Sequence, residues 1–379
     1  MSDFNQQQSI IVAGHICLDL TPRFPESALS TLIPGSLVRV DQMHCSVGGA
    51  VANTGLALHQ LGVKTRLMGR ISDDLFGKEV KRILSGYDPA LTCDMIQVAG
   101  ESTSYSVVVA PPGVDRLFLH CPGCNDLFEA DDIILPKDQQ VKLLHFGYPP
   151  VMRSVYRDDG QQLVSLFHKA HAAGIATSLD MCSVDPTSEA GGIDWQRWLA
   201  NVLPHVDIFV PSLDELLFML GISDQPVSLE LLQSVGKQIL DSGVGVLMLK
   251  LGEQGVYLQT AQQIHAVFDA QSWSEVSLHC PCYSVDVVST NGAGDYTIAG
   301  FLAAILAGQT PSQALHSAVG VGAWHVQSPD ELARWDVIQK RIDGGWEQLD
   351  KTLSGVITEK NHHDIDTATC HQTADATHA

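Results

Sequence analysis

The stretch VVSTNGAGD at residues 287–295 decides the fold that we predict from this sequence. Two valines indicate a strand, a glycine-rich turn follows, and an apolar helix then runs through Phe301 and Ile305. Glycines let successive backbone N–H groups converge at the start of a helix, where the helix dipole favours an anion. We therefore predict a phosphate-binding turn between a strand and a helix.

Asp295 lies within the first turn of that predicted helix. A carboxylate beside a bound phosphate is useful when it accepts a proton, for example from an attacking hydroxyl group. General-base activation is therefore the role that we predict for Asp295. The alternative is an ordinary carboxylate that interacts with the helix dipole.

Around this motif the chain alternates short apolar strands with amphipathic helices, which is typical of βαβ units. We predict an α/β fold, a doubly wound and mostly parallel sheet with helices on both faces, in a domain that spans residues 9–350. The predicted strands cover residues 10–13, 65–68, 141–146, 175–179, 207–210 and 245–250. The predicted helices cover residues 50–61, 74–85, 161–173, 195–203, 214–220 and 229–242, and two long helices follow.

Two stretches interrupt this alternation, at about residues 20–46 and 91–119, and contain alternating β-type residues without helices between them. They predict a small β lid. The segment 359–379 is polar, with many Thr and Ala residues and little apolar periodicity, so we predict a disordered tail. A metal site formed by its histidines is the alternative.

The composition is strongly acidic, because Lys and Arg total 22 against 43 Asp and Glu, a formal net charge of −21. Nucleic acid and anionic membranes are therefore disfavoured as partners, since their binding requires clustered cations. A bound phosphate would have to be neutralised locally, by metal ions and backbone N–H groups. No apolar run reaches the ~18 to 20 residues of a membrane helix, and residues 1–8 lack a signal-peptide pattern, so we expect a cytoplasmic protein.

The nine cysteines are an odd number scattered along the chain, so we expect free thiols instead of a disulfide framework. Cys121 and Cys124 have the spacing of half a zinc site, but no second pair in the sequence completes it. We interpret residues 123–125 as a turn beside the lid, in which Asn125 faces the substrate.

A second pair of glycines, Gly48 and Gly49, opens the predicted helix at residues 50–61. Glycines allow a ligand to approach the backbone, and Asn53 in the same helix offers two donors and an acceptor that suit sugar hydroxyl groups. Asp19 follows the first strand, near the carboxyl end where ligands of open α/β sheets bind. The alternatives are a tightly packed helix start for the glycines and a loop or capping carboxylate for Asp19.

Together, and in this order, these motifs resemble the PfkB/ribokinase family of carbohydrate kinases over about residues 9–350. The family's signature Asp-Thr-x-Gly-Ala-Gly-Asp is similar to residues 289–295, with Ser289 in place of the first Asp. Its Gly-Gly-x-x-x-Asn motif matches residues 48–53. The resemblance implies a ribokinase-like fold and an ATP-dependent kinase, which moves the γ-phosphoryl group of ATP to a hydroxyl group of a sugar or sugar-like small molecule.

The resemblance also implies roles for individual residues. Asp295 would be the catalytic base, and the lid would close over the sugar. The backbone amides implied to form an anion hole are those of Gly292, Ala293 and Gly294, and the residues implied to hold substrate hydroxyl groups are Asp19, Gly48, Gly49 and Asn53. A homodimer formed through the lid is compatible with this resemblance.

Residues 249–255 look like the family's strand and turn near the nucleotide. The resemblance implies that Lys250 and Thr290 lie near ATP, and that Gly252 and Gly255 leave room for it.

Residues 211–215 fall where the family has Pro-Asn-x-x-Glu, whose Asn and Glu organise the water shell of Mg²⁺. Ser212 replaces that Asn, whereas Glu215 remains, so Mg²⁺ binding at these two residues is expected. The alternative for Glu215 is a carboxylate in the first turn of a helix.

Ser289 stands at the position that is relevant to activation by monovalent cations. In cation-dependent relatives, the loop with the corresponding Asp helps to coordinate potassium, which orders the anion hole. A neutral hydroxyl group lacks the charge that offsets desolvation of the ion, so we expect weak or no activation by potassium.

Ala50 bears on the substrate, because the form Gly-Gly-Ala-x-Ala-Asn is more similar to fructokinases than to ribokinases. This favours an unphosphorylated sugar. A nucleoside kinase of the same family is one alternative, and a ligand-binding or regulatory protein without turnover, suggested by Ser289 and Ser212, is another. A dinucleotide oxidoreductase is disfavoured, because no Gly-x-Gly-x-x-Gly follows the strand at residues 10–13.

Overall fold

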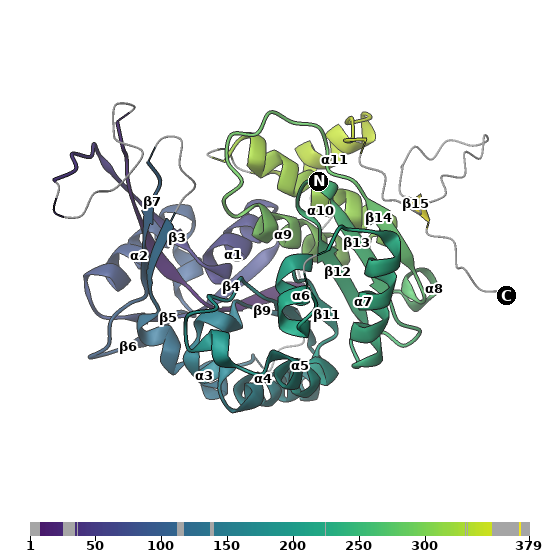
Figure 1. Cartoon of the computed structure of the whole chain (residues 1–379), viewed down its shortest axis with the longest axis horizontal. Coiled ribbons are helices and arrows are strands. Elements are labelled where there is room, and N and C mark those ends of the chain that lie inside the picture. Colours follow the sequence, from purple (N-terminus) through teal and green to yellow (C-terminus); the bar gives the residue numbers. More distant parts are fainter. Residues whose placement is uncertain are drawn as a thin grey trace.

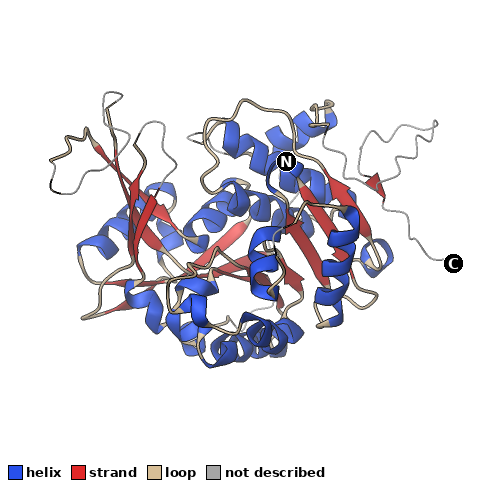
Figure 2. Ribbon diagram, viewed as in Figure 1, coloured by secondary structure: helices blue, strands red, loops and turns tan. Residues whose placement is uncertain are grey.

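The fold is built around the larger of the protein's two main sheets (Figures 1 and 2). The computed structural model describes residues 8–25, 35, 37–111, 117–136, 140–223, 225–329, 331, 333–350 and 371–372. Within these residues the larger sheet has nine strands, in the order β15-β14-β13-β12-β11-β10-β9-β1-β4.

Six neighbouring strands of this sheet are parallel, and the others run antiparallel at one edge. The parallel strands are β1 (Ser9–Gly14), β4 (Lys64–Met68), β9 (Val141–Gly147), β10 (Ala176–Asp180), β11 (Ile208–Phe209) and β12 (Val246–Lys250). The antiparallel strands are β13 (Val256–Thr260), β14 (Ser277–Cys280) and β15 (His371–Gln372).

Helices cover both faces of the larger sheet, because successive side chains of each buried strand point to opposite sides. In β1, Ile10 and Val12 belong to one hydrophobic cluster, while Ile11 and Ala13 belong to another. The first cluster includes residues of α1 (Ala50–Gln60), α2 (Leu75–Tyr87), α8 (Ala270–Trp273), α9 (Ala293–Leu306), α10 (Pro311–Gln327) and α11 (Trp335–Asp343). The second includes residues of α3 (Arg153–Tyr156), α4 (Gln161–Ala172), α5 (Trp195–Val202), α6 (Leu213–Leu220) and α7 (Leu229–Asp241). The predicted fold class is confirmed.

A smaller sheet lies at one end of the molecule, where α2 packs against it (Figure 1). Its strand order is β3-β2-β7-β8, built from β2 (Cys17–Pro22), β3 (Met43–Gly48), β7 (Tyr105–Val109) and β8 (Leu117–Cys121). These strands come from or border the stretches for which the sequence predicts a lid. However, β6 (Ile96–Val98) pairs with β5 (Arg70–Ser72) in a separate two-stranded sheet. Parts of the predicted lid, residues 26–34, 36 and 112–116, lie outside the described residues.

The predicted strand at Val287 and Val288 is wrong. Strand β14 ends at Cys280, and no strand follows it among residues 281–292. The side chains of Val287 and Val288 are 65% and 68% exposed, and the backbone N–H of Val288 donates to the carbonyl oxygen of Val326 in α10 (2.9 Å). The segment before the glycine-rich turn is therefore an exposed loop held by α10.

Strand β15 lies inside the segment for which the sequence predicts a disordered tail. The rest of that segment lies outside the described residues. Among the helices that the structure describes, none combines the length and the apolar character needed to cross a membrane.

Candidate active site

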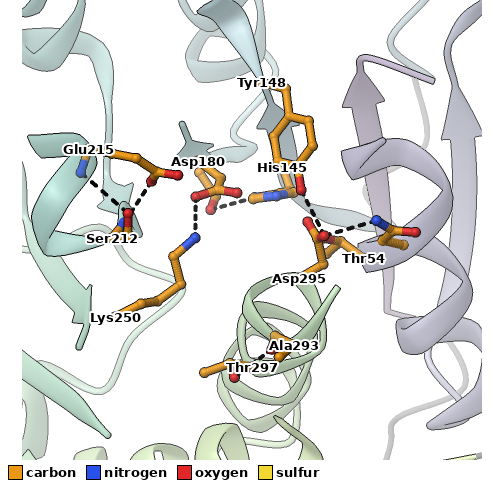
Figure 3. Close-up of polar contacts among 12 residues, drawn as sticks. Thr54, His145, Tyr148, Asp180, Ser212, Glu215, Lys250, Ala293, Asp295 and Thr297 are labelled. Carbon is orange, nitrogen blue, oxygen red and sulfur yellow. Dashed lines mark hydrogen bonds and ion pairs between the residues drawn. The ribbon is translucent and has the colours of Figure 1, made fainter. Parts of the chain in front are cut away.

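The carboxyl ends of the parallel strands lie along one edge of the larger sheet, and polar side chains gather there. Tyr148 follows β9, while Asp180 and Lys250 are the last residues of β10 and β12. Ser212 follows β11 and precedes α6. Figure 3 shows Tyr148 pointing to Asp295 at the start of α9, Asp180 next to Lys250, and Ser212 beside Glu215.

Asp295 is the third residue of α9, and its side chain is buried at 3% exposure. Its Oδ2 accepts hydrogen bonds from Asn53 Nδ2 (3.0 Å) and from the Tyr148 hydroxyl (2.7 Å), and its Oδ1 accepts one from Thr54 Oγ1 (3.3 Å). Asn53 and Thr54 lie in the first turns of α1, which packs against α9. Donors from two other elements therefore hold this carboxylate in one orientation.

Tyr148 was not predicted as a site residue. It has a left-handed backbone (φ 68°, ψ 46°), which is uncommon for a residue with a side chain and costs about 1 kcal/mol or more. Burial, and then the charge of Asp295, raise the pKa of Tyr148 well above its usual range, so the hydroxyl keeps its proton and donates a hydrogen bond to Asp295. Its position after a predicted parallel strand is the signal that could have identified it.

The glycine-rich turn leaves space at the start of α9. Gly292 caps the helix with φ 76°, and a Cβ there would meet its nearest atom, His325 Nε2, at 3.5 Å. A Cβ on Gly294 would meet its nearest neighbours, in the Lys250 side chain, at 3.6 Å. Both distances are ordinary van der Waals contacts, so packing does not require glycine at position 294. Close approach of a ligand to the amides of the first helical turn is a physical reason for it.

Other contacts hold this turn in place. His325 Nε2 lies 2.7 Å from the carbonyl oxygen of Asn291, and burial lowers the pKa of His325. The backbone N–H of Ala293 donates to the carbonyl oxygen of Thr290 (3.3 Å), so Thr290 contributes a backbone contact while its side chain is exposed.

Lys250 and Asp180 form a buried ion pair beside the turn, with 2.8 Å between Lys250 Nζ and Asp180 Oδ1. Their side chains are only 13% and 2% exposed. Burial opposes the charge of Lys250, but attraction by Asp180, Glu215 and Asp295 outweighs it and raises the pKa of Lys250 above its usual range. Burial acts to raise the pKa of Asp180, and the contact with the Lys250 ammonium group opposes that rise. Sequence reasoning missed Asp180, although it directly follows the parallel strand predicted at residues 175–179.

Ser212 and Glu215 form a capping box at the start of α6. The backbone N–H of Ser212 donates to Glu215 Oε2 (2.9 Å), and the backbone N–H of Glu215 donates to Ser212 Oγ (3.4 Å). No cluster of three or more His, Cys, Asp or Glu residues in the described part of the chain is placed to hold a metal ion. Mg²⁺ nevertheless fits here, because it usually binds one or two carboxylates and completes its shell with water and phosphate oxygens.

Asp19 and the glycine pair at residues 48–49 meet between β2 and α1. A Cβ on Gly48 would lie 2.2 Å from Asp19 Oδ2, and a Cβ on Gly49 would lie 2.6 Å from both the carbonyl oxygen and Nδ1 of His15. Close packing of Asp19 and His15 is therefore a sufficient reason for these glycines. Asp19 Oδ1 accepts a hydrogen bond from Cys17 Sγ (3.3 Å), and burial raises the pKa of Asp19.

Two histidines that were not predicted as site residues lie between Asp19 and Tyr148. His15 Nε2 lies 3.3 Å from Ser104 Oγ, and its ring packs against those of His120 and Tyr148 at 5.1 and 6.2 Å between centroids. Burial lowers the pKa of His15 to about 3 and also lowers that of His120. Neutral hydrogen-bonding groups thus extend from the smaller sheet to the Asp295 network.

The remaining predicted residues have different surroundings. Asn125 is buried in a short 3-10 helix (Gly123–Leu127), where its Nδ2 donates to the carbonyl oxygen of Ile16 (2.8 Å). A Cβ on Gly255 would lie 2.0 Å from the carbonyl oxygen of Cys280, so packing explains that glycine. A Cβ on Gly252 would have no described neighbour within 4 Å beyond the adjacent residues. The structure therefore brings Asp295, Asn53 and Lys250 together and gives Asn125 and Gly255 contacts within the protein.

Comparisons with known proteins agree with the fold. Residues 7–334 match the model of the pfkB family carbohydrate kinase. The chain is 24% identical to the bifunctional protein HldE of Proteus mirabilis, over 91% of this chain and 67% of that protein. It is 25% identical to the 2-dehydro-3-deoxygluconokinase of Thermoproteus tenax, over 79% of this chain and 85% of the relative. The solved structure of Arabidopsis thaliana ribokinase complexed with ribose and ATP superposes with a TM-score of 0.69 at 19% identity, covering 88% of this chain and 98% of that one.

Proposed function

The chain belongs to the pfkB family of carbohydrate kinases, and from this premise we propose that it transfers the γ-phosphoryl group of Mg-ATP to a hydroxyl group of an uncharged sugar. The observation that carries this proposal is the Asp295 carboxylate, fixed by three hydrogen bonds beside a helix start with space for a phosphate. A proton acceptor and an anion site are the two parts that phosphoryl transfer to a hydroxyl group requires.

In the proposed reaction, the sugar hydroxyl group gives its proton to the carboxylate of Asp295. Its oxygen then forms a bond to the γ-phosphorus, while the bond from that phosphorus to the β–γ bridging oxygen breaks and ADP leaves. Tyr148, Asn53 and Thr54 keep the carboxylate aimed at the hydroxyl group. The amides of Gly292 and Gly294 would stabilise the charge on the transferring phosphoryl oxygens, whereas the N–H of Ala293 already donates to the carbonyl oxygen of Thr290 (3.3 Å).

ATP would lie between the start of α9 and the turn at Gly252, where a Cβ would have no described neighbour within 4 Å beyond the adjacent residues. Glu215, with the Ser212 hydroxyl beside it, would hold Mg²⁺ through water and phosphate oxygens. The ion would neutralise phosphate charge in a protein whose formal net charge is −21. Thr290 would contact the nucleotide from the exposed side of the turn.

The sugar would lie between Asp295 and the smaller sheet, which would act as the lid. Asp19 and the amide oxygen of Asn53 offer acceptors for hydroxyl groups, and Gly48 packs directly against the Asp19 carboxylate. His15 and His120, with their lowered pKa values, are neutral donors or acceptors near pH 7. These groups favour an uncharged polyol over an anionic one, in agreement with the motif that contains Ala50.

An ATP-consumption screen over sugars, sugar acids and nucleosides tests the proposal. We expect ADP release that depends on an unphosphorylated sugar and on Mg²⁺, and a phosphorylated sugar by mass spectrometry. Turnover with nucleosides alone would show that the substrate is a nucleoside and not a sugar. No turnover with any acceptor, while ATP still binds by calorimetry, would favour a regulatory protein with this fold.

A further inference from the structure

Lys250 reaches the start of α9 from the end of β12 (Figure 3). Its Nζ lies 3.6 Å from the place where a Cβ on Gly294 would stand, and its Cδ lies at the same distance. The ammonium group is therefore in contact range of any anion bound to the first turn of that helix. The family resemblance implied only that Lys250 lies near the nucleotide, whereas this geometry places its ammonium group beside the first turn of α9.

The charge around Lys250 is unbalanced. Three carboxylates, those of Asp180, Glu215 and Asp295, attract this one ammonium group, and Asp180 contacts it directly at 2.8 Å. Burying an ion pair seldom adds stability, because desolvation offsets most of the attraction. A nearly buried lysine at the ligand-binding edge of a sheet is therefore better explained by an interaction with a ligand than by a contribution to folding stability.

The other groups near the site supply little positive charge for a bound phosphoryl group. One oxygen of Glu215 accepts a hydrogen bond from its own capping box, and Ser212 offers a single neutral hydroxyl group. The backbone N–H of Ala293 already donates to Thr290 at 3.3 Å. A γ-phosphoryl group in this acidic surrounding needs positive charge on the side of β12.

We propose that Lys250 is a catalytic cation, held in place by Asp180, that contacts oxygens of the transferring phosphoryl group and stabilises its charge in the transition state. This inference rests on the proposed function. The ammonium group keeps its protons throughout, so the proton of the sugar still goes to Asp295. Asp180 is a positioning residue, because it acts through Lys250.

Steady-state kinetics of Lys250→Met, with an acceptor found in the screen, test this role. We expect kcat to fall roughly 10²- to 10³-fold, the usual cost of removing one electrostatic donor to the transition state, with KM for ATP and sugar within several-fold. Lys250→Arg should recover part of the loss, because it keeps the charge but not the shape. Lys237→Met is the matched control, since Lys237 is exposed and pairs with Asp241 on α7.

A second measurement does not depend on the sugar. Calorimetry with Mg-ADP and aluminium fluoride, which mimics the transferring phosphoryl group, should show a loss of about 100-fold for Lys250→Met. Affinity for Mg-ADP alone should stay within several-fold. Asp180→Asn should show a smaller loss in the same direction, and it provides the test if Lys250→Met does not fold.

Three results would overturn the inference: a kcat within threefold of wild type, a change only in KM for ATP, or equal losses for Mg-ADP with and without aluminium fluoride. Failure of the proposed function is a different result, because the wild-type protein itself would then show no turnover with any acceptor.

Discussion

Helices α1 and α9 both begin after a glycine with a positive φ angle and pack against each other, yet their first turns have different neighbours. At the start of α1, a Cβ on Gly49 would lie 2.6 Å from the carbonyl oxygen of His15. At the start of α9, a Cβ on Gly294 would find its nearest neighbours at 3.6 Å. The α1 turn is filled by protein, whereas the α9 turn has space for a ligand.

This difference shows that a glycine-rich helix start can be required for two different structural reasons. A glycine-rich helix start is required either because another part of the protein approaches it or because a ligand does. The neighbours of the position where Cβ would stand distinguish the two cases. We infer that α9 presents its amides to a phosphate, and that α1 mainly positions Asp19, His15 and the Asn53 side chain.

The largest effect expected from this comparison is that of Asp295→Asn at the α9 start. The variant removes the proton acceptor, so kcat should fall roughly 10²- to 10⁴-fold, while ATP affinity stays within several-fold. Steady-state kinetics and ATP calorimetry measure the two quantities. Asp214→Asn, a change at an exposed carboxylate in the first turn of α6, is the control. Near-normal turnover of Asp295→Asn would show that Asp295 is not the catalytic base.

A smaller effect is expected on the α1 side. Loss of a hydrogen bond to the sugar costs about 1 to 3 kcal/mol, so Asp19→Asn should raise KM for the sugar roughly 5- to 150-fold and leave KM for ATP unchanged. Asn53→Ala should also lower kcat, because its amide donates to Asp295. Equal changes in both KM values, or none, would indicate that these side chains only support the structure.

The smallest effect concerns potassium. Ser289 Oγ accepts a hydrogen bond from the backbone N–H of Asn291 (3.3 Å), so a neutral group already orders the start of the α9 turn. We expect kcat to change less than about twofold when potassium chloride replaces the choline salt at fixed ionic strength, since no formal charge attracts the ion. Saturable activation at low millimolar potassium would contradict this, whereas a Ser289→Asp variant that gains activation would support it.

Much of the fold could be predicted from local pattern. The parallel strands and the helices between them lie within a few residues of their predicted bounds, because buried strands and amphipathic helices have distinct periods. Two valines at residues 287–288 were misinterpreted as a strand, since their type favours β structure while their exposure depends on α10, which follows later in the chain. Strands β13 and β14 were not predicted, although each pairs with its sequence neighbour.

Only the candidate-site residues that belong to a sequence motif could be predicted. Asp295 and the glycines stand in recognisable sequence patterns, whereas Tyr148 and Asp180 act through partners 147 and 70 residues away. Their partners depend on which strands become neighbours in the sheet. The rule that functional groups gather at the carboxyl ends of parallel strands would have selected both positions.

The comparison of the two helix starts is tested most directly by measuring Tm and kcat for Gly294→Ala beside Gly49→Ala. Gly294 has room for a Cβ in a helical turn, so Tm should stay the same or rise, because Ala in a helix is favoured by about 0.5 to 1 kcal/mol. Its kcat should fall roughly 10- to 100-fold, because the added methyl group displaces the phosphate. Gly49→Ala should lower Tm, because φ is 84° and the carbonyl oxygen of His15 is 2.6 Å from the new Cβ. A Gly294→Ala protein with normal kcat, or with a Tm as low as that of Gly49→Ala, would contradict the account.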